Sequence, residues 1–141
     1  MDDNFKVSMK LANDKLLFKG RSRDNEEVSM DYFPPLGDGA GYTGLELLLM
    51  SFSGCSATSV VFLLRKMGKT IESMTINSEG IKNEELPRAF REIKIKYTIE
   101  SQDVNAADVS KAIKLSEDSV CPVWSMIKGN VDVIPEFEII S

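Results

Sequence analysis

The longest apolar stretch of the chain covers residues 41–68 and reads GYTGLELLLMSFSGCSATSVVFLLRKMG. Between Gly44 and Leu64 its only formal charge is Glu46. Its length, apolar character and flanking glycines predict one helix over residues 43–67, hidden on every side inside a domain. About twenty apolar residues could also cross a bilayer. Serine and threonine side chains interrupt this run, however, and the sequence has no second apolar segment, so we expect no membrane span.

Short runs of alternating apolar and polar residues precede this helix. The alternation begins at Phe5 and continues to Leu11, and shorter runs follow at residues 16–18 and 28–30. Asparagine and aspartate pairs separate the runs and are typical of turns, so the pattern predicts a meander of short antiparallel strands. Residues 32–41, YFPPLGDGAG, are too rich in proline and glycine for a helix or a central strand, and we expect a loop.

Alternation returns after the helix. Residues 71–78 predict a strand, and residues 90–100 form the clearest strand pattern of the chain, with apolar side chains on one face and polar ones on the other. The apolar face of this second strand consists of Ile93, Ile95, Tyr97 and Ile99. We therefore expect a sheet with one buried face and one exposed face.

The last part of the chain combines helical spacing with a final alternating run. Helical spacing covers residues 103–119, with Asp103 or Asn105 as the N-cap. Proline favours the first position of a helix, so the pair Cys121-Pro122 predicts a short helix capped by Cys121. The run from residue 131 to 139 contains a proline at position 135, which lacks an amide hydrogen and favours a sheet edge.

Size and charge restrict the class of protein. A chain of 141 residues and 15.7 kDa has the size of one domain, residues 1–141. The net charge of −5 and the absence of clustered lysine and arginine argue against a nucleic-acid partner. The N-terminal residues MDDNFKVSMK lack the blocks of a signal peptide, so we expect a cytoplasmic location.

Two cysteines and no histidine limit the possible chemistry. Without histidine, Ser-His-Asp catalysis, Cys-His catalysis and most zinc sites are excluded. The two cysteines are far apart in the sequence and form no CxxC motif, which also argues against a metal site. In the cytoplasm such cysteines are either buried and inert, metal-bound or redox-active.

Cys55 lies near the middle of the apolar helix. On a continuous helix it shares a face with the residues three, four and seven positions away. These residues are Leu48, Ser51, Phe52, Thr58, Ser59 and Phe62. Three hydroxyl groups and two aromatic rings could form a pocket that stabilises a thiolate and holds an apolar molecule. The alternative is a small buried side chain that allows helices to pack closely.

Two further groups have competing interpretations. Glu46 precedes Cys55 by nine residues, which places it on the opposite side of one straight helix and roughly 13 Å along the axis. Either the helix breaks near Ser53-Gly54, or Glu46 serves a second subunit, another part of the fold or the helix dipole. Cys121 at a helix N-terminus faces unpaired amides that lower its pKa, which favours Cys121 as the thiolate. The alternative for Cys121 is a free cysteine that fills a loop.

Three segments together, LELLLMSFSGCSATSVVFLLRKMG, EELPRAFREIKIKY and AIKLSEDSVCPV, resemble the osmotically inducible protein C and organic hydroperoxide resistance (OsmC/Ohr) family. The resemblance covers nearly the whole chain from about Phe5. It implies an α/β fold of the α+β type, with antiparallel sheets wrapped around buried central helices. It also implies that two chains intertwine as a homodimer, with active sites at the subunit interface. It also implies thiol-dependent reduction of organic hydroperoxides by an external dithiol reductant, without a metal or a flavin.

The resemblance implies a role for each cysteine. Cys55 matches the peroxidatic cysteine and Cys121 the resolving cysteine. The Cys55 thiolate would attack the peroxide, and the resulting sulfenic acid would condense with Cys121.

One position departs from the family pattern. Leu45 stands where the family places an activating glutamate, and Glu46 follows one place later. Arg21 or Arg23 could supply the arginine that pairs with this acid. The departure motivates a second hypothesis, a non-catalytic homodimer that binds a small hydrophobic ligand in the pocket beside Cys55. General thiol-disulfide exchange is a third and weaker hypothesis, because no CxxC motif is present.

Overall fold

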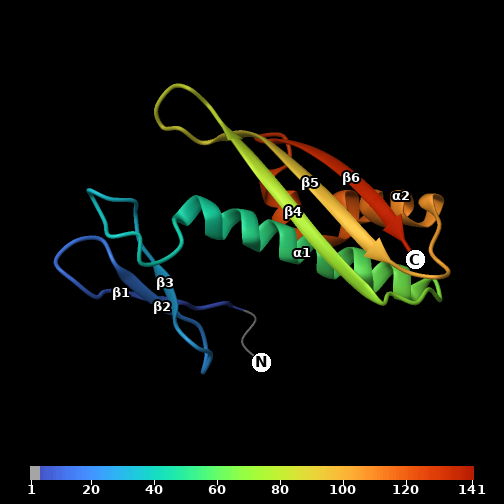
Figure 1. Ribbon diagram of the computed structural model, residues 1–141, viewed down its shortest axis with the longest axis horizontal. Helices are drawn as coiled ribbons and strands as arrows, with labels where there is room; N and C mark the ends of the chain where they lie inside the picture. The colour runs from blue at the N-terminus through green and yellow to red at the C-terminus, as the bar shows by residue number, and fades with distance from the viewer. Residues whose placement is uncertain (1–3) are drawn as a thin grey trace. The chain divides into compact units, whose positions relative to one another are not determined.

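A computed structural model describes residues 4–141, and the first three residues of the N-terminal stretch lie outside the described residues. The chain divides into two compact units, Met1–Leu48 and Leu49–Ser141. Figure 1 shows the strands β1 to β3 of the first unit in blue and the sheet β4 to β6 of the second in yellow-green to red.

The first unit contains the predicted meander. Strands β1 (Ser8–Leu11), β2 (Phe18–Arg21) and β3 (Val28–Met30) pair antiparallel in that order. β2 begins two residues later than the sequence pattern suggested. The reason is local, since the Asn13 side chain accepts hydrogen bonds from the backbone N–H groups of Lys15 and Leu17 and holds this segment as a turn.

The proline- and glycine-rich loop is organised around one buried carboxylate. The Asp31 side chain accepts hydrogen bonds from the backbone N–H groups of Ala40 (3.0 Å), Tyr32 (2.8 Å) and Asp38 (3.2 Å). These bonds, the one from Ala40 foremost, hold the pKa of Asp31 below its ordinary value. These hydrogen bonds hold the loop, which has no regular secondary structure, in one conformation where it leads into the long helix.

Helix α1 (Gly44–Lys66) is continuous through Gly54, as the apolar stretch predicted. Its first turn is closed by a reciprocal pair of hydrogen bonds between Thr43 and Glu46. The Thr43 N–H donates to Glu46 Oε1 (2.8 Å), and the Glu46 N–H donates to Thr43 Oγ1 (3.2 Å). The helix ends before Gly68, whose φ of +84° suits a residue without a Cβ atom.

The second unit is a three-stranded sheet covered by helices. β4 (Ser73–Lys82) pairs antiparallel with β5 (Phe90–Glu100), and β6 (Asp132–Ile140) pairs with β5 from the other side. The α+β class is therefore confirmed. One pairing differs from the expected antiparallel sheets, because β6 runs parallel to β5.

The connection between β5 and β6 explains the parallel pairing. It contains α2 (Ala106–Leu115), a π-helical segment η1 (Ser116–Val120) and α3 (Pro122–Ile127). A helical crossover returns the chain to the starting end of the sheet, so the next strand runs parallel to β5. β6 lies at the sheet edge, as its proline predicted, and continues through Pro135.

The core of the second unit lies between the sheet and the helices. On β5 the side chains of Ile93, Ile95, Tyr97 and Ile99 are at most 1% exposed, while Lys94 and Lys96 on its other face are exposed. The core joins these residues to a stripe of α1 and to the inner face of α2. The amphipathic interpretation of both β5 and α2 is confirmed, and Asn105 caps α2 through a capping box with Asp108.

Only one stripe of α1 is buried within the chain. The buried positions are Phe52, Ser56, Ser59, Val60 and Leu64. Met50 (45% exposed) and Phe62 (58% exposed) face outward, so the expectation of a helix hidden on every side is wrong for a single chain. A sheet in one layer covers a helix from one side only. By length and composition α1 could cross a bilayer, but core helices of globular domains pass the same test.

Candidate functional site

The two cysteines come from different elements of the second unit. Cys55 lies on α1 and is partly exposed, whereas Cys121 is 2% exposed and caps the N-terminus of α3. The Cys121 Sγ accepts a hydrogen bond from the Trp124 N–H (3.4 Å), and Pro122 occupies the first turn. The predicted N-cap role of Cys121 is confirmed, and both thiols are free.

The Cys55 thiol lies close enough to Cys121 to affect its pKa. Burial is the main cause that raises the pKa of Cys121, and the neighbouring Cys55 thiol raises it further. Hydrogen bonds from the backbone N–H groups of Trp124 and Val123 act in the opposite direction. The expectation that the helix terminus lowers the pKa of Cys121 is therefore wrong, because the cost of burying a charged sulfur exceeds the gain from a six-residue helix.

A buried tyrosine closes the site from the sheet. The Tyr97 hydroxyl on β5 hydrogen-bonds the Ser56 hydroxyl on α1, and both residues are fully buried. Burial raises the pKa of Tyr97 to about 12, with a smaller contribution from Cys121, while the Ser56 hydrogen bond opposes the shift. Cys121 is therefore close enough to Tyr97 to affect its pKa electrostatically. The site joins α1, β5 and α3.

An aromatic pair connects α1 to α3 next to the cysteines. The rings of Phe52 and Trp124 meet edge to face with centroids 5.4 Å apart. Both side chains are at most 2% exposed. This contact fixes α3, and with it Cys121, against the helix that carries Cys55.

The hydroxyl-lined pocket expected around Cys55 is not present in that form. Thr58 donates its hydroxyl to the Gly54 carbonyl (2.8 Å), and Ser59 donates to the carbonyl of Cys55 itself (3.2 Å). Serine and threonine inside helices often bond the carbonyl four residues earlier, which removes these donors from a neighbouring thiol. Of the six residues expected to line this pocket, Phe52 and Ser59 are buried, whereas the exposed ones are Leu48, Ser51, Thr58 and Phe62.

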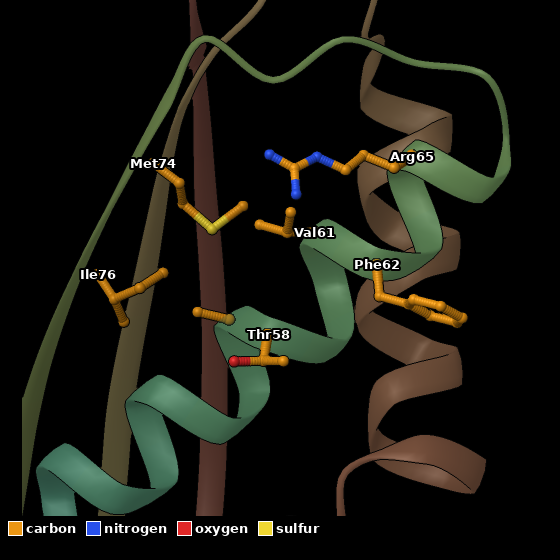
Figure 2. A pocket seen from close by; sticks show the side chains of 7 residues that line it. Thr58, Val61, Phe62, Arg65, Met74 and Ile76 are labelled. Atoms are coloured by element: carbon orange, nitrogen blue, oxygen red, sulfur yellow. The ribbon is translucent and has the colours of Figure 1, made fainter. Parts of the chain in front are cut away.

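A different depression is present between α1 and β4. It has a volume of about 550 Å³ and is lined by Ala57, Thr58, Val61, Phe62, Arg65, Met74 and Ile76. Figure 2 shows the Arg65 side chain reaching from α1 toward Met74 of β4. We call this depression the α1–β4 groove. Thr58 and Phe62 are the two expected pocket residues that it includes.

Two of the candidate activating residues, Glu46 and Arg21, have local partners in the first unit. Glu46 caps α1, and α1 shows no break that would turn it toward Cys55. Arg21 forms an exposed ion pair with Glu27 (3.6 Å). Arg23 lies in the turn after β2 with a φ of +56°.

Comparison with known proteins identifies the family of this chain. The family model described as "OsmC-like protein" matches residues 37–136, a region that includes both cysteines. The chain belongs to the OsmC-like protein family. It is 29% identical over 126 residues to Protein YhfA of Escherichia coli strain K12, covering 89% of this chain and 92% of that protein.

Solved structures have the same fold. A hypothetical protein from Aquifex aeolicus VF5 superposes with a TM-score of 0.85 at 25% identity, over 98% of this chain and 97% of that one. The organic hydroperoxide resistance protein OhrB of Bacillus subtilis superposes with a TM-score of 0.65 at 16% identity, over 96% and 98% of the two chains. The latter likeness shows the OsmC-like fold alone.

Sequence reasoning missed three residues of this OsmC-like site, namely Ser56, Tyr97 and Trp124. Tyr97 carried a usable signal, because a tyrosine on the buried face of a strand needs a hydrogen-bond partner. The identity of that partner could not be inferred, since Ser56 is 41 residues away in the chain.

Replacing Tyr97 by phenylalanine should change how stability depends on pH. The unfolded chain loses the phenol proton near pH 10, whereas the folded protein keeps it until about pH 12. The folded state therefore binds more protons in this window, and stability falls as pH rises through it, by on the order of 2 kcal/mol. The Tyr97→Phe variant should lack this decline. At neutral pH its free energy of unfolding should be lower by about 1 kcal/mol, because the Ser56 hydroxyl loses its hydrogen-bond partner.

Urea unfolding at about pH 8 and pH 11.5 measures both effects. The Tyr42→Phe variant is the matched control, since Tyr42 is 52% exposed. An equal alkaline decline in wild type and Tyr97→Phe would contradict the assignment.

Proposed function

We propose that this OsmC-like protein is a thiol-dependent peroxidase that reduces organic or lipid-like hydroperoxides in the cytoplasm. The observation that carries the proposal is the adjacency of the Cys55 and Cys121 thiols. Family membership and the fold shared with a protein named for organic hydroperoxide resistance support it. The site chemistry uses cysteine side chains and assigns no cofactor.

The exposures of the two cysteine residues support a different role for each. Cys55 is the more accessible thiol, so it meets the hydroperoxide. Its thiolate attacks one peroxide oxygen, the O–O bond breaks, and the alkoxide leaves as an alcohol after gaining a proton. Cys55 becomes a sulfenic acid.

The buried thiol completes the cycle. Cys121 attacks the Cys55 sulfenic sulfur, a disulfide forms, and water leaves with the Cys121 proton. Two electrons from an external dithiol reductant restore both thiols, and the reductant ends as its own disulfide.

We further propose that the working form is a homodimer. Several large apolar side chains of α1 are exposed within one chain, including Met50 and Phe62. A second copy would remove this surface from water, a favourable change of about 25 cal/mol for each Å². Glu46 and either Arg21 or Arg23 are the candidate activating pair in such an assembly.

Peroxide titration tests the peroxidase proposal directly. Reduced protein treated with cumene hydroperoxide should consume about one equivalent and form a Cys55–Cys121 disulfide, seen by peptide mapping. With a dithiol reductant in excess, consumption should continue over many turnovers. Absence of both the disulfide and continued consumption would reject this function.

A second function is favoured by the α1–β4 groove. Its lining is mostly apolar, and its volume of about 550 Å³ falls within the usual range for small-molecule sites. A non-catalytic homodimer could hold a small hydrophobic ligand there. An apolar fluorescent probe should then bind to the wild type and not to the Ala57→Trp variant. Such binding, in a protein that forms no disulfide with peroxide, would favour this function over the first.

A further inference from the structure

The segment before Cys121 is wound as a π-helix rather than an α-helix. The Cys121 N–H donates to the Ser116 carbonyl (2.9 Å), which closes the last turn of η1. Immediately afterwards, Cys121 caps α3 through its side chain. Cys121 is therefore the junction between two short helical segments, and its position depends on the angle between them. π-helical turns inside helices are frequent at functional sites.

One lysine connects the two segments on either side of Cys121. Lys128 follows the last residue of α3, and its Nζ lies 2.9 Å from Glu117 Oε2 and 3.1 Å from Asp118 Oδ1. Both carboxylates belong to η1. Lys114 at the end of α2 adds a contact of 3.5 Å to Asp118. We call the ion pairs of Lys128 with Glu117 and Asp118 the Lys128 clamp.

We propose that the Lys128 clamp positions the Cys121 thiol beside Cys55 and thereby promotes the disulfide between them. The proposal rests on the proposed function, because the disulfide is its second step. A disulfide forms only when the two Cα atoms approach within about 7 Å with suitable Cβ directions. The clamp joins η1 to the C-terminal end of α3, so it limits how far the junction at Cys121 can open.

Lys128 and Asp118 keep their charges at neutral pH. Hydrogen bonding to Glu117 is the main cause that raises the pKa of Lys128, and hydrogen bonding to Lys128 is the main cause that lowers the pKa of Asp118. A single exposed ion pair contributes little, but one ammonium shared by two carboxylates is a small network. We therefore expect an effect of a few-fold on the disulfide rather than loss of the fold.

A redox titration with glutathione measures the inferred effect without any peroxide. Reduced protein reacts with oxidised glutathione to give the Cys55–Cys121 disulfide and two molecules of reduced glutathione, and the equilibrium constant reports how well the two thiols are aligned. Lys128→Met should lower this constant about fivefold at low ionic strength. Lys128→Arg should retain most of it, because the charge remains.

The matched control is Lys111→Met, an exposed lysine of α2 with no ion pair among the described residues. It should leave the constant unchanged. Adding about 1 M salt should weaken the wild-type disulfide and leave Lys128→Met nearly unaffected, because salt screens the clamp. If Lys128 had only a structural role, Lys128→Met would lower the free energy of unfolding, and the equilibrium constant of the disulfide would not show this dependence on salt.

The outcomes separate the two proposals. A disulfide equally stable in wild type and Lys128→Met overturns the clamp and leaves the peroxidase standing. A wild-type protein that forms no Cys55–Cys121 disulfide overturns both. A Lys128-dependent disulfide in a protein that does not consume hydroperoxide supports the clamp and overturns the peroxidase.

Discussion

Replacing Cys55 by serine is expected to reduce the rate of alkyl hydroperoxide consumption by at least about a thousandfold, to the rate without protein. A serine hydroxyl stays protonated at neutral pH, so it cannot replace a thiolate as the attacking group. Steady-state consumption of cumene hydroperoxide with an excess of a dithiol measures this loss. Equal rates for wild type and Cys55→Ser would reject Cys55 as the reacting residue.

The Cys121→Ser variant is the matched control, because it removes the other thiol of the same site. It should still consume one equivalent of hydroperoxide in a single turnover, and its Cys55 sulfenic acid should be trapped by dimedone. It should form no intramolecular disulfide. If Cys121→Ser instead lost the first turnover and Cys55→Ser kept it, the two roles would be reversed.

Local patterns predicted the elements that hold the site. The alternation in residues 90–100 defined β5, the apolar run defined α1, and Cys121-Pro122 defined the start of α3. Each of these features depends on residues close together in the sequence, where periodicity and capping preferences act directly.

The contacts within the site depend on residues far apart in the sequence and were not predicted. The Tyr97–Ser56 hydrogen bond and the Phe52–Trp124 contact join different elements. No periodicity specifies such pairs. The direction of β6 was also missed, because an alternating pattern is the same for parallel and antiparallel neighbours.

Two errors came from competing uses of polar groups. The Thr58 hydroxyl bonds its own helix instead of the Cys55 thiol. The pKa of Cys121 is raised because burial outweighs the helix terminus, and the sequence did not reveal that burial. In both cases the sequence predicted which group was present, whereas packing decided which interaction prevailed.

Replacing Trp124 by alanine is expected to lower the free energy of unfolding by about 3–5 kcal/mol, the usual cost of removing a large buried aromatic side chain. Trp124 is 2% exposed and packs edge to face on Phe52. It is the only tryptophan of the chain, so urea unfolding should be followed by far-ultraviolet circular dichroism instead of fluorescence. Trp124→Phe keeps an aromatic ring, so its free energy of unfolding should fall by clearly less, on the order of 1–2 kcal/mol.

The same substitution should also separate the two cysteines, which distinguishes a site effect from loss of stability alone. α3 would lose its edge-to-face contact with Phe52 of α1, so Cys121 would no longer be held beside Cys55. The Cys55–Cys121 disulfide, measured against glutathione, would then weaken together with stability. Met126→Ala is the matched control, since Met126 lies on the same helix and is 75% exposed. A Trp124→Ala protein that loses less than about 1 kcal/mol would show that α3 does not depend on this contact, and Cys121 would then have to be held by the Lys128 clamp and the core contacts of its neighbours alone.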